Sequence, residues 1–303
     1  FILMVVPYKL TPDDTAKKFL DSPACRTYKE FIVFLSESVK GKVLDSETHS
    51  ENIDKFLKIF DKLDSFIAEC PLKEKSMSRF GNLSYRDWYS KMSDNAETFI
   101  SSLFESIDHD TLLLLVNYFK DSFGNCTRID YGTGHEMAFA FLLCCLFKLN
   151  YFKKEVADLV VLFVFKKYLL LVRNIQKTYS LEPAGSHGSW GLDDFQFLPY
   201  IFGASQMLSP IQKFNPIDIL NKDLCTQNKN DFMFFGCIDF IHQIKRGPFS
   251  EHSSILYSAS QAVSWTKIYQ SLNRMYIAEV LSKFPVIQHV WFGTLMPLHA
   301  DSI

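Results

Sequence analysis

Apolar residues recur with the period of an α-helix between positions 53 and 67. A repeat of about 3.6 residues places apolar side chains on one face of a helix and charged side chains on the other. Such a helix is stabilised mainly by packing its apolar face against other elements. The pattern therefore predicts a helix within a larger packed fold. The apolar positions are Ile53, Phe56, Leu57, Phe60, Leu63 and Ile67, and the polar face carries Asp54, Lys55, Lys58, Asp61, Lys62 and Asp64.

Prolines preceded by capping side chains indicate further helix starts. A capping side chain that is followed by proline and then by a polar or acidic residue is typical of the first turn of a helix. No convincing run of alternating strands and no Asn-Gly or Asp-Gly hairpin turn is found, which argues against a β-sandwich and against a βαβ sheet. We therefore expect an all-α fold. The expected starts are Thr11-Pro12-Asp13-Asp14, Ser209-Pro210-Ile211-Gln212 and Asn215-Pro216-Ile217-Asp218.

The remaining chain supplies more helices without a repeat. The 303 residues include 48% hydrophobic residues, which is ample for a large buried core. No periodicity of the solenoid type is visible. Further helices are expected near Arg26–Val39, Tyr85–Phe104, Asp110–Phe119, His135–Phe147, Glu155–Tyr179, Asp231–Ile244 and Trp265–Phe284.

Charge and cysteine usage exclude several classes of partner and cofactor. The 32 basic and 34 acidic residues give a net charge of −2, so no overall field attracts nucleic acid or an anionic membrane. None of the seven cysteines shows the paired spacing of a zinc site, and we expect reduced thiols in a cytosolic or nuclear protein. The apolar segments Met137–Phe147 and Leu159–Phe165 are shorter than the roughly 20 residues of a membrane span and are expected to be core helices. The initial FILMVVP lacks the basic region and cleavage site of a signal peptide.

Two loops contain an unusual share of the glycines. The segments RIDYGTGHE, Arg128–Glu136, and EPAGSHGSWGLDD, Glu182–Asp194, hold five of the 12 glycines. Glycine permits positive φ and close approach of the backbone to a ligand. We therefore expect the two loops to form two walls of one site.

The first loop has the composition of an anion site. Gly132, Thr133 and Gly134 precede the helix expected from His135, where unpaired N–H groups and the helix dipole favour phosphate. Arg128 adds a second positive group. The spacing is neither that of a P-loop nor that of a dinucleotide fold. A tight helix-entry turn with Thr133 as its cap is the alternative.

The second loop ends in two neighbouring carboxylates. Asp193 and Asp194 could bind a cation or orient a peptide, and the alternative is ordinary capping at a helix start. Aromatic residues nearby offer a surface for a proline ring or an adenine, unless they belong to the core. These aromatic residues are Trp190, Phe195, Phe197 and Tyr200.

Two later segments interrupt helices. In GPFSEHS, Gly247–Ser253, an acid–base pair of Glu251 and His252 is conceivable, although sequence neighbours usually point apart. In KFPVIQH, Lys283–His289, Pro285 is expected to end a helix and leave the backbone groups that follow free. No nucleophile elbow or catalytic triad spacing is found, so nothing indicates a hydrolase.

These motifs together resemble a known family. RIDYGTGHE, EPAGSHGSWGLDDFQFLP, GPFSEHS and KFPVIQH, with RFGN at Arg79–Asn82 and YRDWY from Tyr85, are similar to the phosphotyrosyl phosphatase activators of serine/threonine protein phosphatase 2A. The resemblance runs from about residue 79 to His289. It makes 1–303 a single domain, with divergent N-terminal helices in 1–78 and the motif-bearing part in 79–303. TPDD and ESVKG resemble fungal members most, and Ser189 stands where the family more often has a bulkier apolar residue.

The resemblance implies helical core, linker and lid parts around a nucleotide cleft, with ATP and magnesium as cofactors. It implies binding to the phosphatase 2A catalytic subunit with its scaffold subunit, and peptidyl-prolyl cis/trans isomerase activity on proline-containing peptides. The metal would lie near the Gly188 carbonyl and the Asp194 carboxylate. Residues expected to bind nucleotide are Arg128, Thr133 and Gly134, with Pro285, Val286, Ile287, Gln288 and His289 closing over it.

Isomerisation needs no acid, base or nucleophile, because its obstacle is a rotation barrier of roughly 20 kcal/mol. The candidate catalytic residues are Trp190, Asp193 and Asp194. They would form a pocket that stabilises the amide when it is twisted during rotation. We expect a monomer, or a dimer once peptide is bound, in the cytoplasm and also in the nucleus. A non-enzymatic helical adaptor that docks on the phosphatase is the alternative, and an independent ATP hydrolase is disfavoured by the missing Walker lysine.

Overall fold

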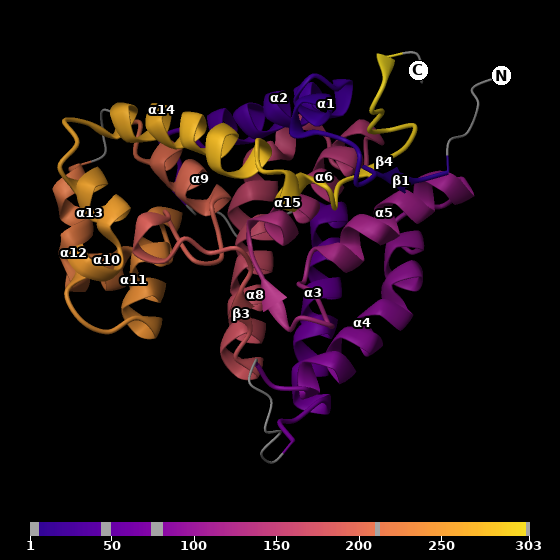
Figure 1. Cartoon of the computed structure of the whole chain (residues 1–303), viewed down its shortest axis with the longest axis horizontal. Helices are drawn as coiled ribbons and strands as arrows, with labels where there is room; N and C mark the ends of the chain where they lie inside the picture. The colour runs from indigo at the N-terminus through magenta and orange to yellow at the C-terminus, as the bar shows by residue number, and fades with distance from the viewer. Residues whose placement is uncertain (1–5, 44–49, 74–80, 210–212, 301–303) are drawn as a thin grey trace.

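Helices make up nearly all of the regular structure (Figure 1). The computed structural model describes residues 6–43, 50–73, 81–209 and 213–300. Outside these ranges lie the first five residues of FILMVVP, Arg79 and Phe80 of RFGN, and positions 210–212 of the expected helix start at Ser209. The all-α prediction is confirmed.

The long helices follow the expected ranges closely. The helices for which a range was expected begin within a few residues of it, because the buried residues that produce the helical period also pack in the core. The helix Leu198–Gln206 was not expected. The expected helix near Glu155–Tyr179 is a continuous helical segment that contains a π-helical stretch, η2. The longer helices are α2 Pro23–Ser38, α3 Glu51–Glu69, α4 Ser84–Ser101, α5 His109–Asp121, α6 Thr133–Lys148, α8 Lys166–Tyr179, α9 Leu198–Gln206, α11 Met233–Ile244 and α14 Trp265–Tyr276.

Shorter elements connect and extend these helices. The π-helical stretches are η2 Val160–Phe165 and η5 Ile277–Leu281, and the 3₁₀ turns are η1 Lys154–Val156, η3 Gly188–Trp190 and η4 Pro216–Leu220. The short α-helices are α1 Ala16–Leu20, α7 Ala157–Leu159, α10 Lys222–Asn228, α12 Phe249–His252, α13 Ser254–Ser260 and α15 Phe284–Ile287.

Helix α3 shows how the sequence pattern becomes packing. The hydroxyl of Ser50 accepts the N–H of Ile53 at the helix start, and Ile53, Phe56 and Phe60 are fully buried. The apolar face packs against α4 and α8, and the charged face is exposed. Each fully buried large side chain of this kind contributes about 1.5–3 kcal/mol of transfer free energy.

Helix α6 is the centre of the core. Its residues from Met137 to Leu146 are buried except Ala138, which is partly exposed, and α2, α5 and α15 pack around it. A helix that is apolar on all sides has to be enclosed by protein. The expectation that Met137–Phe147 and Leu159–Phe165 form core helices is confirmed, and no helix in the described ranges is long and apolar enough to cross a membrane.

The expected helix start at Thr11 is wrong. The Asp14 carboxylate accepts the N–H of Thr11 at 2.7 Å and its hydroxyl at 2.9 Å, and this closes a turn instead. Helix α1 begins only at Ala16, after Thr15. The start at Asn215 is confirmed, since Asn215 and Asp218 form a reciprocal capping box on η4.

Two pairs of very short strands join distant parts of the chain. Strand β1, Tyr8–Lys9, pairs antiparallel with β4, Trp291–Phe292, and thereby ties the start of the described chain to its end. Strand β2, Asp130–Tyr131, pairs parallel with β3, Glu182–Pro183. In Figure 1, α10 to α13 lie at one end of the long axis, and α4 and α5 lie toward the other. All seven cysteines are free thiols, as expected.

Candidate functional site

The pairing of β2 with β3 brings the two glycine loops side by side. Asp130 lies opposite Glu182, and the Ala184 N–H donates to the Tyr131 carbonyl at 2.8 Å. A Cβ on Gly132 would lie 2.6 Å from the Ala184 carbonyl oxygen. This glycine is therefore required by the close approach of the two loops and not by positive φ. The two loops therefore meet at their paired strands, and the prediction that they form two walls of one binding site stays a prediction.

A cavity of about 380 Å³ opens beside these loops at the N-terminus of α6. Its walls come from the loop before β2, from Ala184 and Gly185, and from the segment around α15. The volume lies within the range of small-molecule sites. We call it the α6 cavity. The predicted nucleotide residues that line it are Arg128, Thr133, Gly134, Pro285, Val286, Gln288 and His289.

Ile287 differs from the other predicted nucleotide residues. Its side chain is fully buried in the core and does not line the cavity. It anchors the short helix that carries its neighbours. Gly134 faces this helix, because a Cβ there would lie 3.5 Å from the Val286 side chain.

The N-terminus of α6 points its first turn at the cavity. Gly132 occupies the N-cap position and no side chain caps the helix, so Thr133 is already the first helical residue. The alternative in which Thr133 is the cap is therefore wrong. The first N–H groups of a helix have no intrahelical partner, and the helix dipole makes this end attractive for an anion.

Charged side chains of both signs line the α6 cavity. Arg128 Nε donates to Asp130 Oδ2 at 2.6 Å. Lys9 Nζ and Trp291 Nε1 both donate to Asp121 Oδ2 at 2.9 Å. Lys9 reaches the cavity from the first strand of the chain. Sequence reasoning missed Lys9 and Asp121, because nothing near them in the sequence shows that the fold joins them. It also gave no role to Asp130, although this acid lies within RIDYGTGHE.

Two histidines also lie in the cavity wall. Nδ1 of His135 lies 2.6 Å from the Asp121 carbonyl oxygen, to which it donates. Burial lowers the pKa of His135 and of His289 below the ordinary value of 6.5. Both rings are therefore neutral at pH 7, and they contribute hydrogen bonds and surface without positive charge.

Ile129 holds a backbone conformation that costs energy. Its φ is +54°, in the left-handed region that β-branched residues avoid at a cost of about 1–2 kcal/mol. The surrounding turn fixes it, because the Ile129 N–H donates to the Asn125 carbonyl at 2.8 Å and the Arg128 N–H donates to Asn125 Oδ1 at 2.9 Å. This turn sets where Arg128 and Asp130 enter the cavity.

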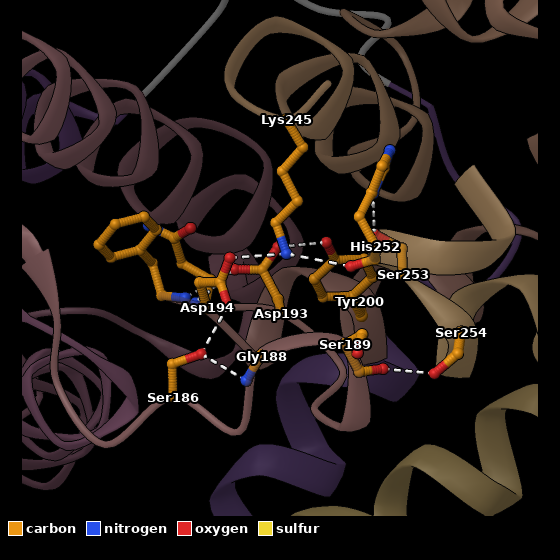
Figure 2. Close-up of polar contacts among 12 residues, drawn as sticks. Ser186, Gly188, Ser189, Asp193, Asp194, Tyr200, Lys245, His252, Ser253 and Ser254 are labelled. Atoms are coloured by element: carbon orange, nitrogen blue, oxygen red, sulfur yellow. Dashed lines mark hydrogen bonds and ion pairs between the residues drawn. The ribbon is translucent and has the colours of Figure 1, made fainter. Parts of the chain in front are cut away.

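The Asp194 cluster in the second loop is a separate group of contacts (Figure 2). Asp194 Oδ1 accepts from Ser186 Oγ at 2.5 Å, and Oδ2 pairs with Lys245 Nζ at 2.6 Å. The Gly188 carbonyl accepts from the Gly191 N–H at 3.1 Å. Asp194 and Gly188 do not line the α6 cavity.

The Asp194 cluster does not fit a magnesium ion in this arrangement. Magnesium takes oxygen ligands in an octahedral shell. Here each Asp194 oxygen and the Gly188 carbonyl already accept from a donor, and the Lys245 ammonium neutralises the carboxylate. Within the described ranges, no group of three or more His, Cys, Asp or Glu side chains is arranged to hold a metal.

Asp193 has a local structural role, as in the capping alternative. Its Oδ1 accepts the N–H groups of Phe195 and Gln196 at 2.8 and 3.0 Å. Its Oδ2 accepts the hydroxyl of Tyr200 at 2.6 Å. Phe195, Phe197 and Tyr200 are buried core residues, whereas the Trp190 side chain is 81% exposed. Of the expected aromatic surface, Trp190 alone is exposed.

Glu136 links the two loops and was missed by sequence reasoning. Its side chain is completely buried, and Oε2 accepts the N–H groups of Phe197 and Leu198 at 2.8 and 2.9 Å. It thereby caps the start of α9, although it belongs to α6. Burial raises its pKa to about 8. The sequence signal was an acid directly before the apolar run that starts at Met137.

The two later segments differ from expectation. His252 Nδ1 lies 2.9 Å from Ser253 Oγ, and within the described residues no hydrogen bond or ion pair joins it to the exposed Glu251. The helix before KFPVIQH ends at Leu281, so the prediction that Pro285 ends it is wrong. Pro285 lies in the first turn of α15, where its missing N–H is tolerated. The N–H groups of Val286, Ile287 and Gln288 are paired rather than free.

The chain is similar to known proteins in sequence and in fold. The profile of a family described as phosphotyrosyl phosphate activator (PTPA) protein matches residues 8–298. The chain belongs to this family. A relative from Dictyostelium discoideum, named probable serine/threonine-protein phosphatase 2A activator 1, is 39% identical over 96% of this chain and 90% of its own length. The Drosophila melanogaster serine/threonine-protein phosphatase 2A activator is 42% identical over 89% of this chain and 69% of its own.

A solved family member has the same architecture. The crystal structure of the PP2A phosphatase activator Ypa1 (PTPA1) superposes with a TM-score of 0.87 at 34% identity, covering 98% of this chain and 96% of that chain. The N-terminal helices are thus part of the family fold, since the profile match begins at residue 8.

Proposed function

We propose that this chain activates serine/threonine protein phosphatase 2A by binding its catalytic subunit, and that it uses ATP with magnesium to do so. The relatives named above are phosphatase 2A activators. The observation that carries the nucleotide part is the α6 cavity, which joins Arg128, the start of α6 and the α15 segment.

The residues of the cavity have distinct roles toward a nucleotide. The first N–H groups of α6 and the Arg128 guanidinium bind phosphate, since both present donors at an anion site. Gln288 and His289 close the opposite wall. A bound magnesium ion supplies positive charge to the phosphates. The apolar wall, with Met137 and Phe141, accommodates the base.

We further propose peptidyl-prolyl isomerase activity in the second loop, on proline-containing peptides. Trp190 offers an exposed ring for a proline. The carboxylates of Asp193 and Asp194 hold the loop through the contacts described above, so this proposal gives them no acid–base work. Isomerisation that proceeds by binding the twisted amide needs no acid or base. The scaffold subunit as a further partner, a monomeric state with peptide-induced dimers, and a cytosolic and nuclear location belong to the same proposal.

A non-enzymatic adaptor remains the second candidate. The fixed Asp194 cluster and the exposed Trp190 favour it, because a rigid loop with one exposed aromatic ring is typical of a docking surface. In that case ATP would not change the activity of the bound phosphatase.

The test is the activation of inactive phosphatase 2A by the purified chain with and without ATP and magnesium. The variants are Arg128→Ala and Asp194→Ala, and the matched control is Arg26→Ala, an exposed arginine of α2 that does not line the cavity. We expect activation to require nucleotide and to be lost in Arg128→Ala but not in Arg26→Ala. Full activation without nucleotide would favour the adaptor.

A further inference from the structure

A second cavity, of about 270 Å³, lies between α8 and α11. We call it the α8–α11 cavity. Its walls come from one face of α8, from the turn that holds Lys229 and Asn230, and from α11 as far as Gln243. It shares no lining residue with the α6 cavity. The two cavities are therefore separate places in the fold.

The charged side chains of the α8–α11 cavity are mostly cations. Four cations line it together with one carboxylate, Asp239, although the chain as a whole has a net charge of −2. Asp239 already accepts from Lys229 Nζ at 3.1 Å and from Thr226 and Gln243, each at 2.7 Å. Lys229 and Asp239 neutralise one another, so a surplus of positive charge remains. The remaining cations are Lys166, Arg173 and Lys177.

Arg173 is a buried cation with weak partners. The residue is 7% exposed, and its guanidinium carbon lies 4.5 Å from the centre of the Phe240 ring. One terminal nitrogen donates to the Gly236 carbonyl at 3.3 Å and the other to the Cys237 thiol, a weak acceptor, at 3.1 Å. Its enclosed Nε has no partner in the described structure. Because no carboxylate of the described residues forms an ion pair with it, its charge in the cavity wall is uncompensated.

Glu136 does not supply the missing counter-charge at pH 7. Arg173 acts on this carboxyl through space and lowers its pKa, but burial has the larger effect and raises the pKa to about 8. Most Glu136 carboxyls are therefore protonated and neutral at pH 7. An anion in the cavity would compensate Arg173 through the low dielectric of the wall, without direct contact with the guanidinium.

Two lysines of α8 supply donors for such an anion. Lys166 Nζ donates to the Asn230 carbonyl, which places it beside the turn before α11. Lys177 is exposed and lies one helical turn after Arg173 on the same face of α8. Burial lowers the pKa of Lys166 below its ordinary value of 10.5, so an anion beside it would stabilise its charged form. Each ammonium group carries three N–H donors.

The combination of cations and apolar wall fits a phosphate monoester. This group carries close to two negative charges at pH 7 and accepts charge-assisted hydrogen bonds from several donors at once. A carboxylate, with one charge, would leave more of the positive surplus uncompensated. The apolar wall suits the carbon part of an ester. Its residues are Leu169, Leu170, Met233 and Phe240.

We propose that the α8–α11 cavity binds a phosphate monoester, with Lys166 and Lys177 as donors to the phosphate and Arg173 as a buried compensating charge. The ester is a small free molecule or a phosphorylated side chain of a protein segment, because both present the same group. This inference does not depend on the proposed nucleotide binding, since the two cavities share no residue.

Phosphorus NMR titrations with the full chain test the proposal. The ligands are glycerol 2-phosphate and a phosphoserine peptide flanked by alanines, and the same peptide without phosphate should not bind. The double variant Lys166→Gln/Lys177→Gln should bind at least about tenfold more weakly than the wild type, because two charged donors are lost. The matched control is Lys167→Gln, the next lysine of α8, which pairs with Asp61 and does not line the cavity. It should bind like the wild type.

The controls also separate this site from the α6 cavity. Arg128→Ala should leave the binding unchanged. If Arg128→Ala weakened it and the double variant did not, the phosphate would lie at the start of α6 and the inference would fail. Failure of the wild type to bind either phosphate ligand would refute the inference and leave the nucleotide proposal standing. Both substituted lysines are at least partly exposed, so the double variant should fold, and circular dichroism checks this.

The ligand that binds more tightly identifies the source of the phosphate. Preference for the peptide indicates a phosphorylated protein segment, and preference for glycerol 2-phosphate indicates a free ester. In both cases the affinity should fall as sodium chloride is raised, because salt screens the charges of the exposed lysines. An affinity independent of salt would contradict the proposed role of the lysines.

Discussion

The buried carboxyl of Glu136 makes the stability of this protein depend on pH in an unusual direction. Burial raises its pKa from the ordinary 4.5 to about 8, while backbone donors and Arg173 only partly oppose the rise. The folded chain therefore binds a proton here that the unfolded chain has released between these two pH values. By linkage, the free energy of unfolding falls as pH rises from 4.5 to 8.

The size of this effect follows from the pKa shift. One pKa unit corresponds to about 1.4 kcal/mol, so the full rise costs the folded state roughly 5 kcal/mol above pH 8 and roughly 3 kcal/mol at pH 7, relative to acid solution. Domains of ordinary stability unfold with about 5–15 kcal/mol. Glu136 alone should thus dominate the pH dependence between pH 5 and pH 8.

The substitution Glu136→Gln removes the titration and keeps an oxygen that accepts the N–H groups of Phe197 and Leu198. We expect the variant to be close to the wild type or slightly less stable at pH 5, because the amide N–H₂ lies where Oε1 has no partner. At pH 8.5 it should be more stable than the wild type by a few kcal/mol.

Urea unfolding of both chains at pH values from 5 to 9 measures the difference in unfolding free energy, so that other titrating groups cancel. Glu105→Gln, at an exposed glutamate, is the matched control and should leave the difference near zero at every pH. If the difference for Glu136→Gln did not change with pH, the carboxyl would be charged in the folded chain and the argument would be wrong.

Two further substitutions test the packing around the site. Gly203→Ala in α9 would place a Cβ 2.3 Å from the backbone nitrogen of Phe234. The free energy of unfolding, measured in urea, should therefore fall by about 1–3 kcal/mol or more. A stable variant would show that α9 and α11 can separate. Asp193→Ala removes the acceptor of two backbone N–H groups and of the Tyr200 hydroxyl, so we expect a loss of roughly 1–3 kcal/mol and faster amide exchange at Phe195. Unchanged exchange would remove Asp193 from the structure of this loop.

Much of the fold was predictable from local patterns. The period of α3 and the apolar length of α6 follow from which residues must be buried, and both helices lie where the sequence placed them. The start of α9 was not predictable, because its first N–H groups are capped by Glu136, about 60 residues earlier in the chain. A cap supplied by another helix leaves no mark next to the helix it caps.

The site was predictable only in part. Glycine content indicated that two loops meet, and the pairing of Asp130 with Glu182 confirms it. The separation of the Asp194 cluster from the cavity was not foreseen, since neighbouring acids in a sequence look alike until their donors are known. Lys245 reaches Asp194 from the end of α11, and Lys9 reaches Asp121 across 112 positions. Such ion pairs depend on tertiary structure alone.

The central claim is that the α6 cavity binds a nucleotide. Calorimetric titration of magnesium-ATP into the wild-type chain and into Gly134→Leu tests it most directly, because a Cβ at this position lies 3.5 Å from Val286 and a larger side chain fills the cavity between them. The account predicts one nucleotide per wild-type chain and no binding to a folded Gly134→Leu chain. Equal binding to both chains, or none to the wild type, would contradict it.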